Sequence, residues 1–600
     1  MSAFQGMVPL ELFGHTRFPA IGSTPYFLTL GPHAFYWFTL QPQRLEVAAT
    51  AERALPTLSV PGQWDAVLHN RHKSALEALL PDYLRARRWF GGKARTIETL
   101  ALREAIPVPR EEPLGYLTLV GVEYTEGEPE TYSLPLTFVT GEQALRLQGT
   151  PAAIARLRVQ GRQQEQEGLL CDALWDREFS KTLLALIARG RRLPAPAGEL
   201  VATPTRPFRR LLRSSAALEP ALLRAEQSNT SVVYGDLFIL KLYRRLDEGL
   251  NPDLEIGRYL TEVCQFANTA PVAGALEYRR QEGEPLTLAI LQSFLPVQGD
   301  AWQYTLDSAG RYYEQVLARR AELGEPPLPA KSLLELSADA VPALVEELAG
   351  LYLEAAQLLG QRTGELHVAL AQAKDDPNFA PEPFTDFYRR SLYQSMMVQA
   401  NQTLQLLRQR LDHLPAPDRP LAQQLLDLQA EVRRRFQAIR DRRIGAIRIR
   451  CHGDYHLGQV LYTGKDFIII DFEGEPARPL SVRRMKRSPL RDVAGMLRSF
   501  HYAAYGALLE HGGIRPEDIP ALEPWARFWY LWVSAVFLKK YLEVVAPAAL
   551  LPANPEHLRL LLDAYLLEKA LYELAYELNN RPDWVRIPLH GLLQLLAPPA

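Results

Sequence analysis

The chain has 600 residues, 47% of them hydrophobic and 23% charged, and a formal net charge of −2. One hydrophobic core does not organise a chain of this length, so we expect about two to four domains. The nearly neutral charge argues against nucleic acid or a membrane surface as a partner. The only cysteines, Cys171, Cys264 and Cys451, are far apart and lack metal-binding spacing, and the start lacks a signal-peptide pattern. We therefore expect a reducing, cytoplasmic location.

The N-terminal third is predicted to be rich in β-structure. Residues 1–45 form a short β tail in this prediction, and a polar, proline-containing stretch near 50–63 follows it. A mixed α and β domain is expected over 60–195, and the proline-rich segment 193–197 is interpreted as the connection to the next domain. The expected elements are strands at 8–13, 26–30 and 34–40, a helix at 75–88, and strands at 114–124 and 131–139.

The pattern between 200 and 300 is again strands with one helix, and it contains a candidate phosphate-binding cation. Lys241 lies inside the apolar run Phe238–Tyr243, where an unpaired lysine would be costly. The next segment, which begins with the helix-start residues Asn251 and Pro252, supplies Glu255 as its expected partner. A lysine on a strand steadied by a glutamate on the following helix is what kinases use to hold ATP phosphates. The alternative is an edge-strand lysine with its charge in solvent and an unrelated helix glutamate.

Two further segments of this region could border a nucleotide. Ser228, Asn229 and Thr230 precede a strand, so a turn there would offer hydroxyls and backbone amides to phosphates. An ordinary hairpin would explain the same residues. No G-x-x-x-x-G-K-[ST] motif is present to support a P-loop. Ser293 and Leu295 follow the strand at 287–291 and are predicted to form the hinge beside adenine.

The last half of the chain, 301–600, is mostly helical in pattern, but one β-hairpin interrupts it. The runs at 460–462 and 467–470 flank a turn, and a turn centred near Lys465 places Gln459 opposite Asp471. Asp454 precedes this hairpin in a loop opened by a glycine. A carboxylate that accepts a hydroxyl proton, followed by an amide and a second carboxylate for Mg²⁺, is the order that phosphoryl transfer requires. The hairpin therefore predicts a kinase centre.

Five longer motifs stand out along the chain: Arg88–Lys93, His452–Gln459, Asp471–Pro476, Ser488–Phe500, and Glu568–Glu573 with Asn580–Trp584. Together they resemble those of the maltokinases, bacterial enzymes that phosphorylate maltose with ATP. The resemblance covers roughly residues 65–600, and its last two motifs are more specific than the kinase pattern alone.

The resemblance implies an α+β, two-lobed protein-kinase-like (aminoglycoside-phosphotransferase-like) fold with an N-terminal cap subdomain. In this scheme the cap is 60–195, the N-lobe 200–300 and the C-lobe 301–600. Asp454 is then the catalytic base, Gln459 and Asp471 hold Mg²⁺, and Glu473 is a further metal-site residue. Asp492 anchors the catalytic loop. His452 and His456 lack further ligands in metal spacing, so His452 is interpreted as a structural residue of that loop.

The family match also implies that Lys569, Tyr572 and Tyr576 bind the sugar. These residues fall at i, i+3 and i+7, so they share one face of a helix, where aromatic rings could stack on sugar rings. A buried stripe of aromatic residues would give the same spacing.

The expected function is the transfer of the ATP γ-phosphoryl group to the anomeric hydroxyl of maltose, with Mg²⁺. Residues 1–45 resemble the C-terminal end of trehalose synthases, so the tail is interpreted either as a docking element for that enzyme or as a gene-boundary relic. Two alternatives stay open: a kinase of the same fold for another sugar, an aminoglycoside or choline, and a non-catalytic scaffold for trehalose synthase.

Overall fold

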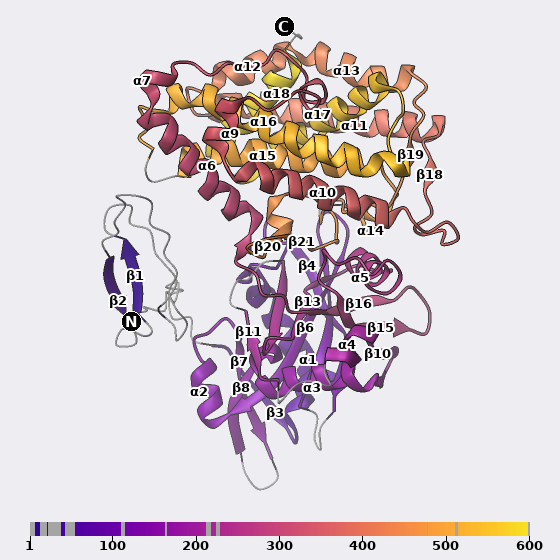
Figure 1. The fold of residues 1–600 in the computed structure, drawn as a ribbon. Helices are drawn as coiled ribbons and strands as arrows, with labels where there is room; N and C mark the ends of the chain where they lie inside the picture. The colour runs from indigo at the N-terminus through magenta and orange to yellow at the C-terminus, as the bar shows by residue number, and fades with distance from the viewer. Residues whose placement is uncertain are drawn as a thin grey trace.

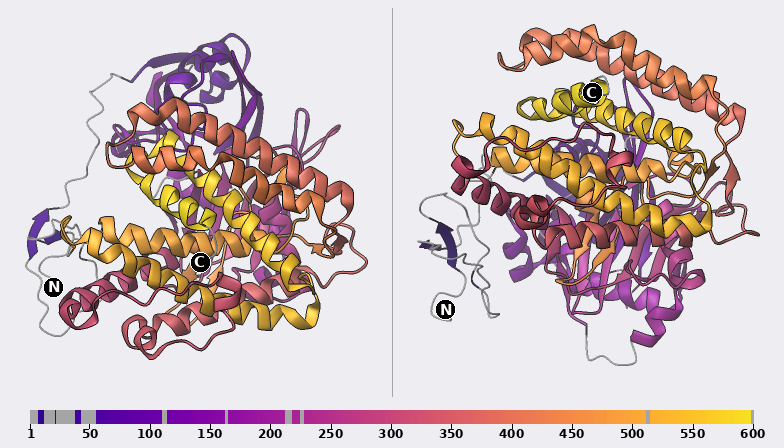
Figure 2. Two further views of the ribbon diagram at one scale, coloured as in Figure 1. Left: turned by 90° about the horizontal axis from the view of Figure 1, so that it is seen from above. Right: turned by 45° about the horizontal axis from the view of Figure 1, so that its top comes forward.

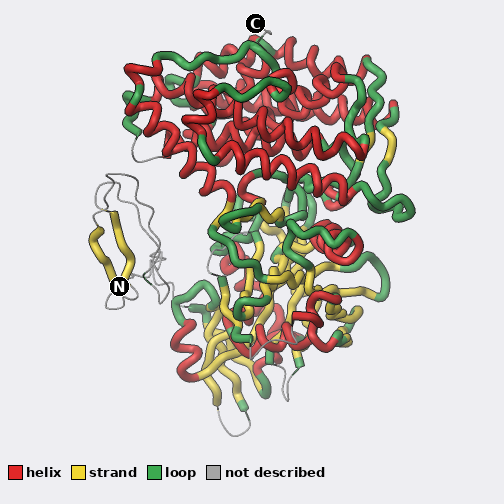
Figure 3. The backbone as a smooth tube through the Cα atoms, in the orientation of Figure 1, coloured by secondary structure: helices red, strands yellow, loops and turns green. Residues whose placement is uncertain are grey.

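The protein is described here from a computed structural model, over residues 7–11, 21, 38–42, 55–109, 114–161, 165–211, 218–223, 228–476, 478–510 and 514–597. Helices gather in one lobe and most strands in the other (Figures 1 and 3). The short hairpin of β20 (Val460–Tyr462) and β21 (Phe467–Ile469) lies where the two lobes meet (Figure 1). The predicted two-lobed α+β architecture with an N-terminal cap is confirmed.

The N-terminal tail contains one described β-ladder. Strand β1 (Met7–Glu11) pairs antiparallel with β2 (Phe38–Pro42), and Met7 lies opposite Pro42. The first of these strands overlaps the prediction at 8–13, and the second overlaps the predicted strand at 34–40, whose first four residues lie outside the described ranges. The predicted strand at 26–30 lies outside the described residues.

The cap domain is one mixed sheet with helices beside it. Its strands follow the order β3-β7-β8-β6-β5-β4, and β3 and β7 pair in parallel whereas the other pairs are antiparallel. Alternating apolar residues on these strands form a separate buried core with the first helix. The elements are β3 (Thr57–Pro61), α1 (Asn70–Arg85), β4 (Ile97–Val108), β5 (Gly115–Tyr124), β6 (Glu130–Thr140), α2 (Gly141–Leu147), β7 (Ala153–Gln160), β8 (Glu165–Asp172) and α3 (Arg177–Arg189).

The N-lobe is built on a seven-stranded sheet of order β11-β12-β13-β16-β15-β10-β9. Its β9 includes Pro194, so the predicted linker at 193–197 is wrong: this segment forms the β9–β10 hairpin. Proline is tolerated there because β9 is an edge strand of the sheet. The elements are β9 (Arg192–Ala195), β10 (Gly198–Pro204), α4 (Arg206–Leu211), β11 (Pro220–Leu222), β12 (Asn229–Tyr234), β13 (Phe238–Tyr243), β14 (Arg245–Leu246), α5 (Pro252–Arg258), the π-helix η5 (Tyr259–Val263), β15 (Val272–Arg280) and β16 (Leu286–Ser293).

One buried arginine ties the cap to the N-lobe. Arg244 is 1% exposed, and its guanidinium contacts the carboxylate of Asp172 in the cap at 2.6 Å and the hydroxyl of Thr230 on β12 at 2.8 Å. Next to it, β14 pairs with β6 of the cap sheet. A buried charge needs a partner of this kind, so the ion pair fixes the cap against the strand that begins with Asn229.

The C-lobe is a helical assembly around one large core. Gly360 on α10 lets α16 approach closely, because a Cβ there would lie 2.3 Å from the Phe537 carbonyl oxygen. Helices α12 and α13 cover the side of this lobe that faces away from the sheets (Figures 1 and 2). The helices are α6 (Ala301–Ala318), α7 (Arg320–Leu323), α8 (Leu333–Leu336), α9 (Ala343–Ala349), α10 (Tyr352–Leu370), α11 (Asp386–Arg410), α12 (Arg419–Asp427), α13 (Gln429–Asp441), α14 (Leu480–Arg483), α15 (Leu490–Glu510), α16 (Ile519–Val545), α17 (Pro555–Asn580) and α18 (Arg586–Leu596).

Short strands complete the C-lobe. Besides the β20–β21 hairpin they are β17 (Gly299–Asp300), which pairs with β20, and β18 (Glu382–Pro383), which pairs with β19 (Ile447–Arg448). Within the described ranges, no helix is both long enough and apolar enough to cross a membrane.

Candidate active site

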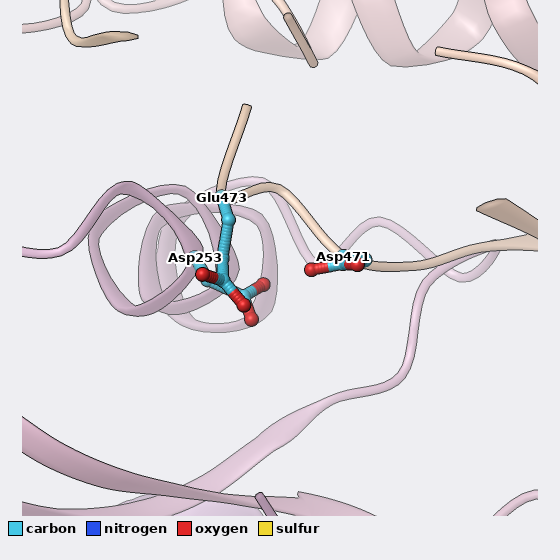
Figure 4. Close-up of side chains that lie close together, drawn as sticks. All are labelled: Asp253, Asp471 and Glu473. Carbon is cyan, nitrogen blue, oxygen red and sulfur yellow. The ribbon is translucent and has the colours of Figure 1, made fainter. Parts of the chain in front are cut away.

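Lys241 lies at the centre of an ionic cluster between the lobes. Its ammonium contacts the carboxylates of Glu473 at 2.6 Å, Asp471 at 2.7 Å and Asp253 at 3.1 Å. The three carboxylates come from α5 and from the segment after β21 (Figure 4). Burial alone would lower the pKa of Lys241, but the carboxylates of Asp253, Asp471 and Glu473 raise it well above its usual value. The lysine is therefore held charged at this position.

The predicted pairing of Lys241 with Glu255 is wrong. The Glu255 carboxylate instead contacts the guanidinium groups of Arg450 and Arg484, each at 2.8 Å. Two residues along a helix correspond to a rotation of about 200°, so Asp253 and Glu255 face opposite directions. Asp253 faces Lys241, whereas Glu255 ties α5 to the C-lobe.

Asp253 is a site residue that the sequence analysis missed. Besides Lys241, it accepts hydrogen bonds from the hydroxyl of Tyr243 at 2.9 Å and from the backbone N–H of Phe472 at 3.0 Å. It is 1% exposed, so these contacts satisfy an otherwise costly buried charge. Asp253 thus holds the strand lysine and the segment that carries Asp471 and Glu473 in one arrangement. It occupies the first turn of α5, two residues before Glu255.

The hairpin register differs by one residue from the prediction. Val460 lies opposite Ile469, and the Ile470 N–H donates to the Gln459 carbonyl at 3.0 Å, so Gln459 aligns with Ile470 rather than with Asp471. Burial raises the pKa of the Asp471 carboxyl, whereas Lys241 and the side-chain amide of Gln459 lower it, so Gln459 still lies near Asp471. Asp471 has a left-handed backbone with φ 67°, which turns it out of the strand direction. Because of this backbone turn, Asp471 lies outside the regular strand pairing of the hairpin.

The donor set at this position fits a hard divalent cation. Mg²⁺ takes carboxylate and amide oxygens; the carboxylates of Asp471 and Glu473 lie within 4.8 Å of one another, and the Gln459 amide is near Asp471. Burial raises the pKa of Asp471, but Lys241 outweighs it and leaves that pKa below its usual value, so the carboxylate stays ionised. Asp253 is less available, because both of its oxygens already accept hydrogen bonds from the protein.

The three residues of the predicted phosphate turn, Ser228, Asn229 and Thr230, differ in their surroundings. Ser228 is exposed, and the Asn229 amide donates to the Glu473 carboxylate at 2.8 Å. Thr230 is buried, and its hydroxyl accepts the hydrogen bond from Arg244, so its predicted place at the phosphate turn is wrong. Successive residues of a strand point to opposite faces, which turns Thr230 toward the cap.

Ser293 and Leu295 lie where the N-lobe passes into the C-lobe. Ser293 ends β16, and its N–H donates to the Pro271 carbonyl at 2.9 Å, while Phe294 donates to Leu237 at 2.8 Å. Leu295 is half-buried in the linker that leads to β17 and α6. The buried hydroxyl of Ser293 has no hydrogen-bond partner among the described residues.

Asp454 lies in a loop that is held from behind by Asp492. The Asp492 carboxylate accepts hydrogen bonds from the backbone N–H groups of His452 at 2.7 Å and Gly453 at 3.0 Å, and it also contacts His367 at 3.1 Å. The ring of His452 contacts the Ile470 carbonyl at 2.9 Å. Gly453 has φ 89°, a conformation that favours glycine. The loop is therefore fixed to both α15 and the hairpin.

The Asp454 carboxylate faces a cation of α17. Its Oδ1 lies 3.5 Å from the Lys569 ammonium, and its Oδ2 lies 3.9 Å from His456. Burial raises the pKa of Asp454, but Lys569, His456 and His452 together lower it below the usual value. An ionised carboxylate beside a solvent-open space can accept a hydroxyl proton.

A cavity that opens to solvent lies against Asp454. Lys569 and Tyr572 line it, and the Lys569 ammonium lies 4.9 Å from the centre of the Tyr572 ring. Tyr576 is 46% exposed one turn further along α17 and does not line the cavity. The cavity wall also includes residues that the sequence analysis did not select as site residues, namely Gln399, Glu475, Arg478, Arg491 and Glu568.

Parts of the chain match models of known protein families. Residues 83–176 match the model of the maltokinase N-terminal cap domain, and residues 315–518 match that of the phosphotransferase enzyme family. Residues 1–37 match the C-terminal domain of maltogenic amylase. The fold and site thus define a kinase-like phosphotransferase with a maltokinase-type cap.

Three individual proteins show what the chain is similar to. A glucosamine kinase from Streptacidiphilus jiangxiensis is 24% identical over 380 residues, which span 62% of this chain and 72% of that protein. A trehalose synthase from Thermus thermophilus is 30% identical over 205 residues, which span 32% of this chain and 19% of that protein. A glucosamine kinase solved with glucosamine, ADP and inorganic phosphate shares the fold, with a TM-score of 0.55 and 18% identity over 86% of this chain and 99% of that one. The resemblance to maltokinases, with a tail like the end of a trehalose synthase, is confirmed.

Proposed function

We propose that the protein transfers the γ-phosphoryl group of ATP to the anomeric hydroxyl of maltose, giving maltose 1-phosphate and ADP. The observation that carries the proposal is the position of Asp454, which lies 3.5 Å from Lys569 at the wall of the cavity. The cap match and the motifs on α17 favour maltose over other acceptors. The sequence similarity of the tail to trehalose synthases fits a role in trehalose and α-glucan metabolism.

Asp454 accepts the proton of the anomeric hydroxyl as the new bond between oxygen and phosphorus forms. The bond between the γ-phosphorus and the bridging oxygen breaks in line with it, and the electron pair leaves with ADP. The anomeric hydroxyl is more acidic than an ordinary alcohol, which suits a carboxylate base. Lys569 keeps Asp454 ionised before the transfer. Positioning and charge stabilisation supply most of the catalysis in such reactions.

Lys241 binds the phosphates, and Asp253 rather than Glu255 orients it. Asp471, Glu473 and Gln459 would hold Mg²⁺, which when bound neutralises the negative charge of the phosphates. The linker at Ser293 and Leu295 borders the adenine, and Ser228 and Asn229 lie beside the phosphates. Asp492 keeps the backbone of the Asp454 loop in place throughout.

On the acceptor side, Lys569 and Tyr572 contact the sugar ring that reacts. Tyr572 offers an aromatic face and a hydroxyl, which suits the mixed apolar and polar surface of a pyranose. Tyr576, exposed one turn further along the helix, would contact the ring that does not react.

A second candidate acceptor is glucosamine, because a glucosamine kinase matches 380 residues of this chain at 24% identity. Measuring ADP release with maltose, glucose, glucosamine, choline and an aminoglycoside at equal concentrations separates these acceptors. We expect the highest kcat/KM with maltose, and a kcat lowered by about 10³-fold or more with every acceptor in Asp454→Asn. A higher kcat/KM with glucosamine would replace maltose as the substrate.

We also propose that the protein works in the cytoplasm, where ATP is available, and that its tail docks on a trehalose synthase. Sedimentation of the full chain with purified trehalose synthase, compared with a chain lacking residues 1–45, tests the docking. A complex that forms equally well without the tail would remove the docking role.

A further inference from the structure

Glu568 is a buried carboxylate on the wall of the cavity. It precedes Lys569 on α17, it is 8% exposed, and it lines the cavity together with Gln399 and Arg491. Across the part of the chain that the structure describes, no hydrogen bond or ion pair reaches its carboxylate; the bond from Gln399 goes to its backbone carbonyl at 2.8 Å. A buried carboxylate is costly unless donors satisfy it.

Other buried carboxylates of this region have protein partners. Asp492 accepts two backbone N–H groups, and Glu475 pairs with Arg478 and lies 3.4 Å from Arg491. On the same helix, Glu573 and Glu577 lie 2.7 Å from the guanidinium groups of Arg498 and Arg581. Glu568 differs from these carboxylates because, among the described residues, its oxygens accept no hydrogen bond and form no ion pair, although Arg491 lies near enough for its charge to be felt.

We propose that the Glu568 carboxylate binds the sugar by accepting hydrogen bonds from its hydroxyl groups. The inference rests on the proposed function and gives a role to Glu568, which begins the motif Glu568–Glu573 but was not selected as a site residue. Neutral hydroxyl donors suit this site better than an ammonium group, because Lys569 is the next residue and Arg491 lines the same wall. Burial lowers the pKa of Arg491, but the neighbouring carboxylates of Glu568 and Glu475 raise it above its usual value.

Calorimetric titration of maltose into the full chain without nucleotide tests this assignment. Glu568→Gln keeps the size of the side chain and removes its charge, and Glu568→Ala removes the acceptor entirely. We expect the maltose dissociation constant to rise about tenfold in the first variant and about 10- to 100-fold in the second, with unchanged affinity for ATP. Asp563→Asn is the matched control, because it removes one charge from the same helix outside the cavity wall, and it should bind maltose like the wild type.

Monodeoxy maltoses identify the hydroxyl that Glu568 accepts. One analogue should bind more weakly than maltose to the wild type but equally well to Glu568→Ala, because the lost hydroxyl and the lost carboxylate are partners. Maltose binding to a folded Glu568→Ala that matches the Asp563→Asn control would overturn the inference, and so would equal losses from every analogue in both proteins. If the wild type neither binds nor phosphorylates maltose, the proposed function fails instead.

Discussion

The two sides of the reaction centre differ in how well the protein satisfies its own charges. On the phosphate side, Lys241 neutralises carboxylates that are 2.6 to 3.1 Å away, and Asp253 has a donor on each oxygen. On the sugar side, Asp454 lies 3.5 Å from its cation, and Glu568 has no donor among the described residues. The phosphate side is therefore organised before a ligand binds, whereas the sugar side depends on the ligand for its hydrogen bonds.

The largest effect on kcat is expected at Asp454, which lies between the phosphate side and the sugar side. Asp454→Asn removes the proton acceptor and should lower kcat by about 10³-fold or more, while maltose and ATP still bind. Asp466→Asn is the control, because Asp466 lies in the turn of the hairpin that follows the Asp454 loop and pairs with Arg362 at 2.8 Å. Steady-state ADP release measures both variants. Nearly wild-type kcat in the Asp454 variant would remove it from the chemistry.

Asp253→Asn tests whether the phosphate side depends on a preformed cluster. The amide would present a donor toward the Lys241 ammonium, so we expect kcat/KM for ATP to fall about 100-fold while maltose affinity stays constant. Initial rates at varied ATP, with maltose titration as the second readout, measure this split. Equal losses for both substrates would mean a general disruption rather than a lysine-orienting role.

Glu255→Gln gives the contrasting result at a position two residues along the same helix. It leaves the Lys241 contacts intact but leaves buried Arg450 without its counter-ion, so we expect a loss of about 3–5 kcal/mol in the free energy of unfolding. In the folded protein, kcat/KM for ATP should stay within a few-fold of the wild type. Urea unfolding together with initial rates distinguishes the two carboxylates. If Glu255→Gln lowered kcat/KM for ATP more than Asp253→Asn does, Glu255 would be the residue that orients Lys241, as the sequence suggested.

Most of the fold was predictable, because β-rich and helical patterns follow one another along the chain and the motifs are long. Lys241 was predictable as well, since a lysine inside an apolar strand needs a partner. The partner of Lys241 was not predictable, because the packing of the lobes decides which side of the short helix α5 faces the lysine. That side carries Asp253 rather than Glu255. The hairpin register failed for a similar reason: spacing alone does not show the left-handed turn at Asp471.

The sugar side was predicted less completely. Lys569 and Tyr572 line the cavity as their shared helix face suggested, and Tyr576 lies further out on an exposed turn. Glu568, Glu475 and Arg491 come from separate segments, and only the packing of α15 and α17 around the Asp454 loop brings them to one cavity.

A smaller effect separates the two tyrosines. Tyr572→Ala should raise the KM for maltose about tenfold, whereas Tyr576→Ala, at 46% exposure, should raise it only a few-fold. Comparing maltose with glucose sharpens the test, because the Tyr576 variant should lose only the preference for the disaccharide. Equal effects on both sugars would place Tyr576 outside the acceptor site.

The pH dependence gives the smallest effect. Cationic neighbours hold the pKa of Asp454 below its usual 3.8, so the base is ionised above that value and activity falls only as pH drops below it. Lys569→Met removes one of these neighbours and should move the acid limb of kcat to higher pH. The pH profiles of kcat for the wild type and this variant measure the shift. An acid limb that does not move would show that Lys569 has no electrostatic effect on Asp454.

The central claim is that Asp454 directs phosphoryl transfer to the anomeric oxygen of maltose. Phosphorus and proton NMR of the product formed from maltose, ATP and Mg²⁺ tests it directly. A phosphate signal coupled to the anomeric proton is the predicted result. Phosphate on any other oxygen of maltose, or no phosphorylation of maltose by the folded protein, would contradict the account.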